Sequence, residues 1–377
     1  MKMKNTMIAA TCGFALVGMA HAQEPAAGNV INLAGSNAFR SAVDATIVSI
    51  MGSGARTAYL SGANITGTTN ATRSIYKGTI NGTQYTIRTN WNGSAGGVVA
   101  LADQTNLAFF PSATTTALAS AGGLAQASGS ENGIANLAFS DVEQAAAGRP
   151  SASFAANAQV GVVPFVFVAG EGTPAAITNI TDQQFTYIWS NGGSTAQVLT
   201  GNAADSGFFL YPTGRSATSG TRISTLSETR YGRGNSVLQF NSTFSGENLT
   251  GTPTSIGNTG LPGGLEIATL LGKTPNTATY SFVSYIGIPD ANIAVSNGAR
   301  ILTYNGVAYS EDKVRTGQYT FWGYQQMYRR TTAAAEVVTF DGLLRNNISS
   351  NLGTAGIALD TMLVDRIGGD GGNITEK

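Results

Sequence analysis

The sequence predicts an α/β fold, because segments with the pattern of buried strands alternate with segments whose apolar residues recur at helical spacing. Three times a short strand is followed by a loop of small residues and then by the start of a helix. These transitions fall at residues 30–39, 85–98 and 207–226. The first turn of a helix presents N–H groups without an internal partner and the positive end of the helix dipole. Helix starts of this kind are suited to binding an oxyanion.

The third transition carries the most distinctive residues. Residues 207–211 have the pattern of a short buried strand, and residues 215–222 read Arg-Ser-Ala-Thr-Ser-Gly-Thr-Arg. Ile223 and Leu226 follow at helical spacing. A guanidinium, two hydroxyls and the N–H groups of a helix start would together form an anion site. An ordinary strand–turn–helix connection with Ser219 as the N-cap explains the same residues and stays open as an alternative.

The other elements follow from the same patterns. Strands are predicted at residues 134–139, 160–168 and 279–289, and helices at residues 39–50, 178–190 and 337–348. Thr181 is the expected N-cap of the second of these helices. Hairpins are expected at residues 74–89 around Asn81-Gly82 and at residues 299–309 around Asn305-Gly306. The continuous apolar run at residues 160–168 suits the middle of a sheet or a strand that crosses between domains.

Some segments are less regular. Residues 103–133 are rich in Ala, Ser, Thr and Gly, and we expect a surface insertion there. The abundance of Gly, Thr and Asn in residues 241–275 indicates loops around short helices. The aromatic residues of 318–328 are typical of a core rather than of a ligand site. Trp91 could line a cleft but is expected in the core, and Arg222 is expected to face solvent.

The N-terminus has the pattern of a secretory signal peptide. It begins Met-Lys-Met-Lys, continues with an apolar run over residues 7–20, and reaches Ala20-His21-Ala22. This pattern predicts cleavage after Ala22 and export, whereas the alternative of an N-terminal anchor would need a longer apolar run. The only Cys and the only His of the chain, Cys12 and His21, lie within this segment.

The predicted mature chain therefore excludes several kinds of chemistry. Without Cys or His it has no disulfide, no thiolate nucleophile, no Cys/His metal site and no Ser-His-Asp triad. Its 19 basic and 21 acidic residues give a net charge of −2, and no basic patch suggests binding to nucleic acid. The sequence also has no acidic cluster of the kind that binds calcium. A hydrolase is accordingly disfavoured, and we expect no enzyme activity, no metal and no cofactor.

Four motifs occur in a specific order along the chain. Residues 93–98 read Gly-Ser-Ala-Gly-Gly-Val, Ser140-Asp141 ends a predicted strand, residues 180–192 form a predicted helix, and residues 215–221 read Arg-Ser-Ala-Thr-Ser-Gly-Thr. In order and spacing they resemble the periplasmic phosphate-binding proteins of bacterial ABC transporters, which are type 2 periplasmic binding proteins. The corresponding family motifs are Gly-Ser-Ser-Gly-Gly-Val, Ser-Asp, Leu-Thr-x-x-Gln-Leu-x-x-Ile-Phe-Ser-Gly and Arg-x-x-x-Ser-Gly-Thr.

The resemblance implies a two-lobed, Venus-flytrap α/β fold with hinge strands that closes on a buried phosphate. After the signal peptide at residues 1–22, one lobe would comprise residues 23–162 with 293–377, and the other residues 163–292. It also implies a periplasmic or extracellular monomer that could deliver phosphate to an inner-membrane ABC permease. The residues implied in ligand binding are Ala38, Phe39, Ser94, Asp141, Arg215, Ser219, Gly220 and Thr221.

Asp141 is the residue that predicts which oxyanion the site prefers. A carboxylate can only accept a hydrogen bond, so it needs a ligand that still carries a proton, as hydrogen phosphate does and sulfate at neutral pH does not. We therefore expect phosphate to be preferred over sulfate, although phosphonate and other tetrahedral oxyanions stay open. An aspartate that merely caps a loop or helix at the strand end is the alternative.

The chain departs from the family pattern in ways that bear on affinity. Ala38 stands where the family has a threonine, so a hydroxyl is lost, and Ser36 or Asn37 could replace it. Ala217 stands where the family has an acidic residue that restrains the arginine. Gly317 begins Gly-Gln-Tyr-Thr in place of the family's Gly-x-Tyr-Pro. These departures also permit a second function, that of an exported surface or structural protein on the same scaffold without a transport role.

Overall fold

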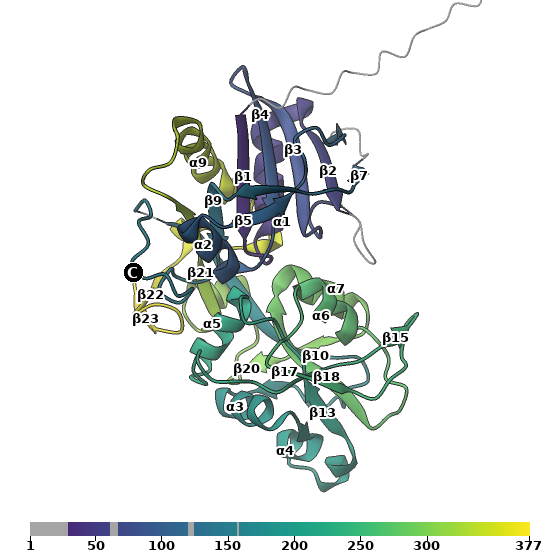
Figure 1. Cartoon of the computed structure of the whole chain (residues 1–377). Coiled ribbons are helices and arrows are strands. Elements are labelled where there is room, and N and C mark those ends of the chain that lie inside the picture. The colour runs from purple at the N-terminus through teal and green to yellow at the C-terminus, as the bar shows by residue number, and fades with distance from the viewer. Residues whose placement is uncertain (1–28, 61–66, 120–123, 157) are drawn as a thin grey trace, which may run out of the picture.

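The computed structural model describes residues 29–60, 67–119, 124–156 and 158–377 (Figure 1). The predicted signal peptide and its cleavage point after Ala22 lie outside these residues. Within the described ranges, no helix combines the length and the apolar character needed to cross a membrane.

One β-sheet runs through the molecule and connects its two parts (Figure 1). Along the sheet, neighbouring strands are β12 (Ser194–Thr195), β13 (Phe209–Pro212), β18 (Tyr280–Gly287), β10 (Gln159–Ala169), β21 (Trp322–Arg329), β9 (Leu137–Ser140), β1 (Asn29–Gly35), β4 (Thr83–Asn90), β3 (Arg73–Ile80), β2 (Arg56–Leu60) and β6 (Ala117–Leu118). β7 (Ala125–Ala127) pairs with β2, and β19 (Arg300–Ile301) pairs with β10. Helices and strands thus share one mixed α/β architecture, as predicted.

The upper part in Figure 1 is built on β1, which is parallel to both β4 and β9. Its helices are α1 (Arg40–Met51), α2 (Ser94–Asp103) and α9 (Ala335–Ile348). The predicted hairpin of β3 and β4 is confirmed: Asn81 and Gly82 at its turn have φ values of 48° and 79°, as a type I′ turn requires. Since β1, β4 and β9 are parallel, their carboxyl ends lie at one edge of the sheet.

The lower part in Figure 1 is built on β13 and β18, which are also parallel. Thr181 caps its first helix as predicted, and Gln184 completes a capping box. The helices are α3 (Asp182–Asn191), α4 (Ala196–Thr200), α5 (Gly220–Glu228), α6 (Gly264–Leu271) and α7 (Ile288–Ser296). The remaining two-stranded sheets pair β5 (Asn106–Phe109) with β8 (Glu131–Ile134), β11 (Asn179–Ile180) with β20 (Thr303–Tyr304), β14 (Gln239–Asn241) with β17 (Thr254–Gly257), β15 (Phe244–Ser245) with β16 (Asn248–Leu249), and β22 (Val364–Ile367) with β23 (Asn373–Glu376).

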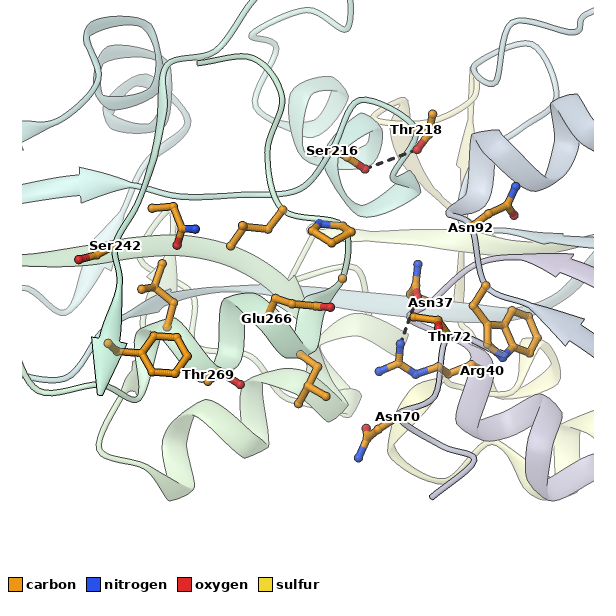
Figure 2. A pocket seen from close by; sticks show the side chains of 18 residues that line it. Asn37, Arg40, Asn70, Thr72, Asn92, Ser216, Thr218, Ser242, Glu266 and Thr269 are labelled. Atoms are coloured by element: carbon orange, nitrogen blue, oxygen red, sulfur yellow. Dashed lines mark hydrogen bonds between the residues drawn. The ribbon is translucent and has the colours of Figure 1, made fainter. Parts of the chain in front are cut away.

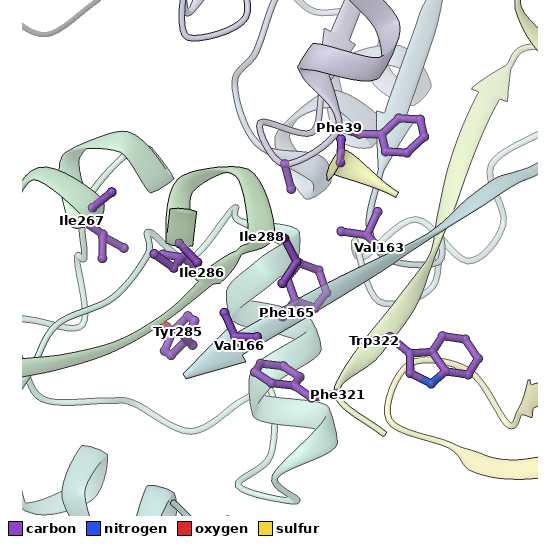
Figure 3. Close-up of a cluster of buried hydrophobic side chains, with 14 of the residues drawn as sticks. Phe39, Val163, Phe165, Val166, Ile267, Tyr285, Ile286, Ile288, Phe321 and Trp322 are labelled. Carbon is purple, nitrogen blue, oxygen red and sulfur yellow. The ribbon is translucent and has the colours of Figure 1, made fainter. Parts of the chain in front are cut away.

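Strand β10 joins the two parts, as its apolar sequence predicts. Its first half pairs with β21 up to Pro164, and its second half pairs with β18 from Phe165 onward. Figure 3 shows the side chains packed around this crossing, where the rings of Phe165 and Phe321 lie 5.6 Å apart. Tyr319 and Phe321 are fully buried, which confirms that the aromatic residues of 318–328 belong to the core.

Three local predictions need correction. Residues 103–133 are not merely a surface insertion, because Phe109 and Phe110 are fully buried and the segment contributes strands β5 to β8. The strand predicted for residues 279–289 ends at Gly287, since Pro289 fits the first turn of α7. The hairpin predicted for residues 299–309 is shorter than expected: Tyr304 and Val307 pair across the tight turn at Asn305-Gly306, whereas β19 pairs with β10 and β20 pairs with β11. The division into lobes at residues 162/163 and 292/293 stays a prediction.

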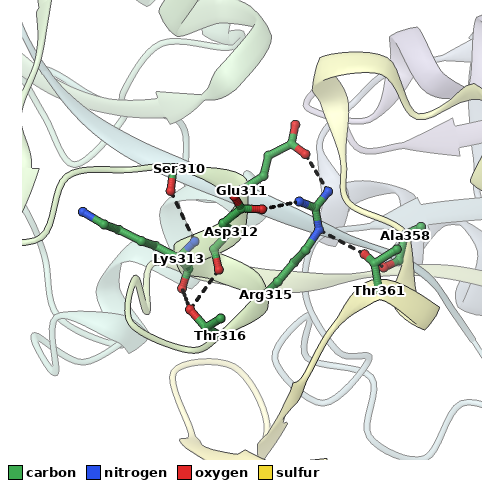
Figure 4. A network of polar contacts seen from close by, with 8 residues as sticks. All are labelled: Ser310, Glu311, Asp312, Lys313, Arg315, Thr316, Ala358 and Thr361. Carbon is green, nitrogen blue, oxygen red and sulfur yellow. Dashed lines mark hydrogen bonds and ion pairs between the residues drawn. The ribbon is translucent and has the colours of Figure 1, made fainter.

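A polar network ties helix α8 (Glu311–Arg315) to the C-terminal segment (Figure 4). Arg315 donates to Glu311 at 2.7 Å, to Asp312 at 2.9 Å and to the hydroxyl of Thr361 at 3.2 Å. Ser310 caps the same helix by accepting from the N–H of Lys313. These contacts hold the chain beyond α9 against the segment that leads into β21.

Close backbone packing fixes the start of α2 against β1, and this gives a first prediction. A methyl group on Gly97 would lie 2.5 Å from Cα of Gly35. We expect Gly97→Ala to lower the free energy of unfolding by about 1–3 kcal/mol, since the backbones must separate. Gly342→Ala is the matched control within α9, because nothing lies within 4 Å of the added methyl there.

Urea denaturation measures both variants. Gly342→Ala should be neutral or stabilise by about 0.5–1 kcal/mol, as expected for alanine in a helix interior. Equal midpoints for the two variants would contradict the proposed contact between α2 and β1.

Candidate functional site

The carboxylate of Asp141 lies where segments from both parts of the molecule meet. Ser36, at the carboxyl end of β1, donates its hydroxyl to Asp141. The N–H of Asp141 donates to the hydroxyl of Ser94 at 3.2 Å. Gly220 approaches from the other part: a methyl group there would lie 2.3 Å from Ser94 Oγ and 2.9 Å from Asp141 Oδ2. The starts of α2 and α5 therefore converge on one carboxylate.

Burial and hydrogen bonding act on Asp141 in opposite directions. Its side chain is buried, and burial raises the pKa of the carboxyl. Hydrogen bonds from Ser36, Ser94 and Thr221, together with the charge of Arg215, lower the pKa but do not offset burial. Hydrogen bonds and the charge of Arg215 thus favour the ionised form of the carboxyl, whereas burial disfavours it.

Arg215 is buried in the same region and is only partly satisfied. Its Nη2 donates to the carbonyl of Pro262 at 2.9 Å, whereas its Nε is buried and has no hydrogen-bond partner among the residues that the structure describes. Burial lowers the pKa of Arg215, and the carboxylates of Asp290, Asp141 and Glu266 raise it. Buried donors without a partner are uncommon in folded proteins, and in this structure the Nε atoms of Arg300 and Arg366 share this state.

Position 217 holds alanine where the resembled family has an acidic residue. Two carboxylates from elsewhere in the chain supply negative charge at Arg215 instead. Asp290 lies in the first turn of α7 and is buried, and Glu266 lies in the first turn of α6. Both contribute negative charge at Arg215. The sequence analysis missed Asp290 because it assigned residues 279–289 to one strand, although Pro289 was a signal for a helix start.

The other predicted ligand residues lie next to this centre. Ser219 caps α5 and accepts weakly from the N–H of Arg222 at 3.4 Å, and Thr221 follows in the first turn. Ala38 is buried, and its methyl group would lie 3.5 Å from a methyl group on Gly287. Phe39 caps α1 with its backbone, while its ring packs against that of Phe139 at 6.3 Å.

Arg222 is buried, so the prediction that it faces solvent is wrong. It is 3% exposed and donates to the carbonyls of Arg215 at 3.2 Å and Asn258 at 2.7 Å. Asn258 accepts from Arg222, and Leu261 pairs with Arg215, so this loop lies against the start of α5. Arg222 therefore holds the loop that carries Arg215.

A second buried arginine, which the sequence analysis missed, links the two parts. Arg40 of α1 donates to the side chain of Asn37 at 3.1 Å, and it lies 3.8 Å from a carboxylate oxygen of Asp290 in α7. Burial raises the pKa of Asp290, whereas Arg40 and then Arg215 lower it. Asp290 thus lies between two guanidinium groups that come from different parts of the molecule.

A cavity of about 490 Å³ adjoins these groups (Figure 2). The upper part contributes Asn37, Arg40, Asn70, Thr72, Trp91 and Asn92, and the lower part contributes Ser216, Thr218, Asn241, Ser242, Phe244, Leu261, Pro262, Gly263, Leu265, Glu266, Thr269 and Leu270. Trp91 is nearly buried and its ring lies 6.2 Å from that of Phe139, so this side chain belongs to the core and also borders the cavity. Among the described residues, no group of three or more His, Cys, Asp or Glu side chains could hold a metal ion.

Comparison with known proteins supports the fold. No protein-family model matches the chain, and no curated protein matches it either. A solved structure from Clostridium perfringens, described as a candidate phosphate ABC transporter substrate-binding protein with bound phosphate, is 12% identical with a TM-score of 0.51. The alignment covers 88% of this chain and 100% of that one. The chain has a periplasmic binding protein fold.

A second solved structure is less similar to the chain. An ABC-type phosphate transport receptor from Vibrio cholerae is 12% identical with a TM-score of 0.46, over 86% of this chain and 98% of that one. At 12% identity, the likeness to the Clostridium perfringens structure concerns the fold and not the ligand.

The turn between β22 and β23 supports the loop after Asp141 and gives a pH-dependent prediction. Asp370 accepts from the N–H of Glu143 at 3.1 Å. Burial, with a contribution from the charge of Glu143, raises the pKa of Asp370 to about 7. Between the ordinary pKa and this raised value, Asp370 is protonated in the folded state but ionised in the unfolded state. This proton uptake stabilises the folded state, and the stabilisation is lost as the pH rises through about 7.

We expect the free energy of unfolding to increase by about 1 kcal/mol from this group when the pH falls from about 8 to about 6. Asp370→Asn should lack this increment, and the difference between the two proteins isolates it from other titrating groups. Chemical denaturation at both pH values measures it. A parallel pH dependence in both proteins would contradict the assignment.

Proposed function

We propose that this protein is an exported binding protein that captures phosphate or a related tetrahedral oxyanion between its two parts. The buried guanidinium of Arg215 supports this proposal most directly, because its charge acts on the Asp141 carboxyl and its Nε has no hydrogen-bond partner among the described residues. An oxyanion that also carries a proton fits both groups: its oxygens accept from Arg215, and its hydroxyl donates to Asp141.

The starts of α2 and α5 complete the proposed cradle. Ser94 and Thr221 supply hydroxyls, Gly220 supplies an N–H that a side chain would obstruct, and both helix dipoles favour negative charge. Ser219, Ala38 and Phe39 would add backbone N–H groups or a hydroxyl at the edge of the cradle. In this arrangement Asp141 would select phosphate over sulfate, since an unprotonated anion would bring two negative oxygens together in a buried site.

Binding would hold the two parts of the molecule together. Asp141 and Ser94 belong to the upper part, whereas Arg215 and Gly220 belong to the lower part, so one ion would contact both. We propose that the lobes close about β10 and β21, with residues 23–162 and 293–377 in one lobe and 163–292 in the other. A periplasmic or extracellular monomer of this kind would serve uptake through an ABC permease and would catalyse no reaction.

Removing the guanidinium tests the site. We expect Arg215→Ala to abolish phosphate binding in isothermal titration calorimetry, and Arg215→Lys to weaken it by about tenfold or more, because lysine keeps the charge but loses the planar fork. Arg149→Ala is the control, since Arg149 pairs with Asp103 at the surface. Unchanged phosphate affinity in Arg215→Lys would exclude Arg215 from the site.

A thermal-shift measurement separates anion binding from a purely structural role. Millimolar phosphate should raise the melting temperature of the wild-type protein, because a ligand that binds the folded state stabilises it. If phosphate, arsenate and sulfate all leave the melting temperature unchanged, the exported surface or structural protein is the better description.

Asp141→Asn tests anion selection. The amide can donate to a fully ionised oxygen, so the variant should bind sulfate more tightly and its preference for phosphate over sulfate should fall by about tenfold or more. Competition calorimetry with the two anions at neutral pH measures the ratio. A ratio equal to that of the wild-type protein would remove the selecting role from Asp141.

A further inference from the structure

Ser36 is placed beside Asp141 by the register of two parallel strands. In β1 and β9, Gly35 lies opposite Phe139, and the N–H of Ser36 donates to the carbonyl of Phe139 at 2.9 Å. Gly35 has a φ value of 119°, and a methyl group on it would lie 1.9 Å from the same carbonyl oxygen, so glycine is required for this approach. Ser36 and Asp141 are therefore brought together by contacts within the upper part of the molecule.

The hydroxyl proton of Ser36 is directed at Asp141. Ser36 is fully buried, and its Oγ donates to Oδ1 of the carboxylate. A hydroxyl has one proton to donate, so Ser36 in this position donates nothing to an anion. The sequence left open that Ser36 replaces the hydroxyl lost at Ala38, but in the structure this hydroxyl binds the carboxylate instead.

The second carboxylate oxygen of Asp141 faces the proposed cradle. A methyl group on Gly220 would lie 2.9 Å from Oδ2 of Asp141 and 2.3 Å from Oγ of Ser94, so Oδ2 lies at the start of α5. Since the proposed ligand binds at the starts of α2 and α5, Oδ2 is the oxygen that can accept its proton. The hydrogen bond from Ser36 to Oδ1 thus fixes the orientation of the carboxylate.

The charge of Asp141 decides which anion the site accepts. An ionised carboxylate accepts the proton of hydrogen phosphate, whereas a protonated carboxyl can donate to sulfate. Burial favours the protonated form and raises the pKa of Asp141. Among the groups that lower this pKa, the hydroxyl of Ser36 has the largest effect. The charge of Arg215 follows, and then the hydroxyls of Ser94 and Thr221.

These groups come from different parts of the molecule. The charged group that acts on the Asp141 carboxyl is Arg215 of the lower part, and the carboxylates of Asp290 and Glu266 act on Arg215 in turn. Ser36 and Asp141 follow neighbouring strands of one sheet, so their hydrogen bond does not depend on the contact between the two parts. Ser36 therefore acts on the carboxyl both before and after an anion binds.

We infer that Ser36 is a positioning residue that determines anion specificity. Its hydroxyl keeps Asp141 ionised and turns Oδ2 toward the ligand, and Ser36 itself does not contact the anion. The site admits a protonated oxyanion and rejects sulfate because of a residue outside the cradle. This inference rests on the proposed function, because it requires that the anion binds beside Asp141.

Sulfate is the probe that tests this inference, because it carries no proton near neutral pH and its binding reports the protonation of the protein. In calorimetry over a pH series with the predicted mature chain, wild-type affinity for sulfate should rise as the pH falls through the pKa of Asp141. Ser36→Ala removes a hydrogen bond to the ionised carboxylate, which raises this pKa. The rise should therefore move to a higher pH by about one unit, and the preference for phosphate over sulfate should fall by about tenfold near neutral pH.

Ser281→Ala is the matched control. Ser281 of β18 is also buried, and its hydroxyl donates to a backbone carbonyl, that of Glu171, at 2.8 Å. This variant should leave the pH profile of sulfate binding unchanged. Ser36→Thr keeps the hydroxyl and should restore the wild-type profile. If the added methyl group prevents folding of Ser36→Thr, the comparison of Ser36→Ala with Ser281→Ala still decides the question.

A double variant tests whether Ser36 acts through Asp141. In the Asp141→Asn background no titrating carboxyl is left at this position, so adding Ser36→Ala should not shift the pH dependence of sulfate binding. A shift that persists in this background would assign the effect to another titrating group and overturn the inference.

The outcomes separate this inference from the proposed function. If the wild-type protein binds neither phosphate nor sulfate at any pH of the series, the proposed function fails and the inference fails with it. If it prefers phosphate and Ser36→Ala keeps the wild-type sulfate profile, the proposed function stands and Ser36 has no part in selection. Equal losses of affinity for both anions, without a shift of the profile, would identify a direct or structural contact and also overturn the inference.

Discussion

The buried carboxylate of Asp141 is the constraint on which the arrangement of the site depends. A charge taken out of water must be compensated, and here the compensation comes from hydroxyls of Ser36, Ser94 and Thr221 and from the charge of Arg215. Two of these residues follow strands of the upper part, and two belong to the segment that follows β13 in the lower part. One buried group therefore holds together segments that are far apart in the sequence.

The charges around this centre alternate across the contact between the two parts. Asp290 of the lower part lies 3.8 Å from Arg40 of the upper part, and it also raises the pKa of Arg215. Buried ion pairs of this kind contribute little net stability, because desolvation offsets much of the attraction. Asp290 thus links α7 of the lower part to α1 of the upper part and places its charge near Arg215 as well.

The sequence was sufficient for the α/β class, the hairpin at Asn81-Gly82, the capped helix after Thr181 and the crossing strand, because each has a local signal in turn chemistry or periodicity. It was also sufficient to bring Ser94, Asp141 and Gly220 into one hypothesis. It missed Arg40 and Asp290, since a buried ion pair between distant segments leaves no local pattern. The burial of Arg222 was not predicted for a related reason. The carbonyls of Arg215 and Asn258, which accept hydrogen bonds from its guanidinium, come from other segments and leave no local pattern.

Strand β10 has a consequence for folding. Its first half completes the ladder with β21 and its second half completes the ladder with β18, so neither part has a finished sheet without it. Two lobes that each contain all the strands of their own sheet can unfold separately, whereas a strand shared by both sheets couples the stabilities of the lobes. We therefore expect the whole chain to lose its structure in one cooperative transition, with the local openings of lowest free energy confined to the segments farthest from β10.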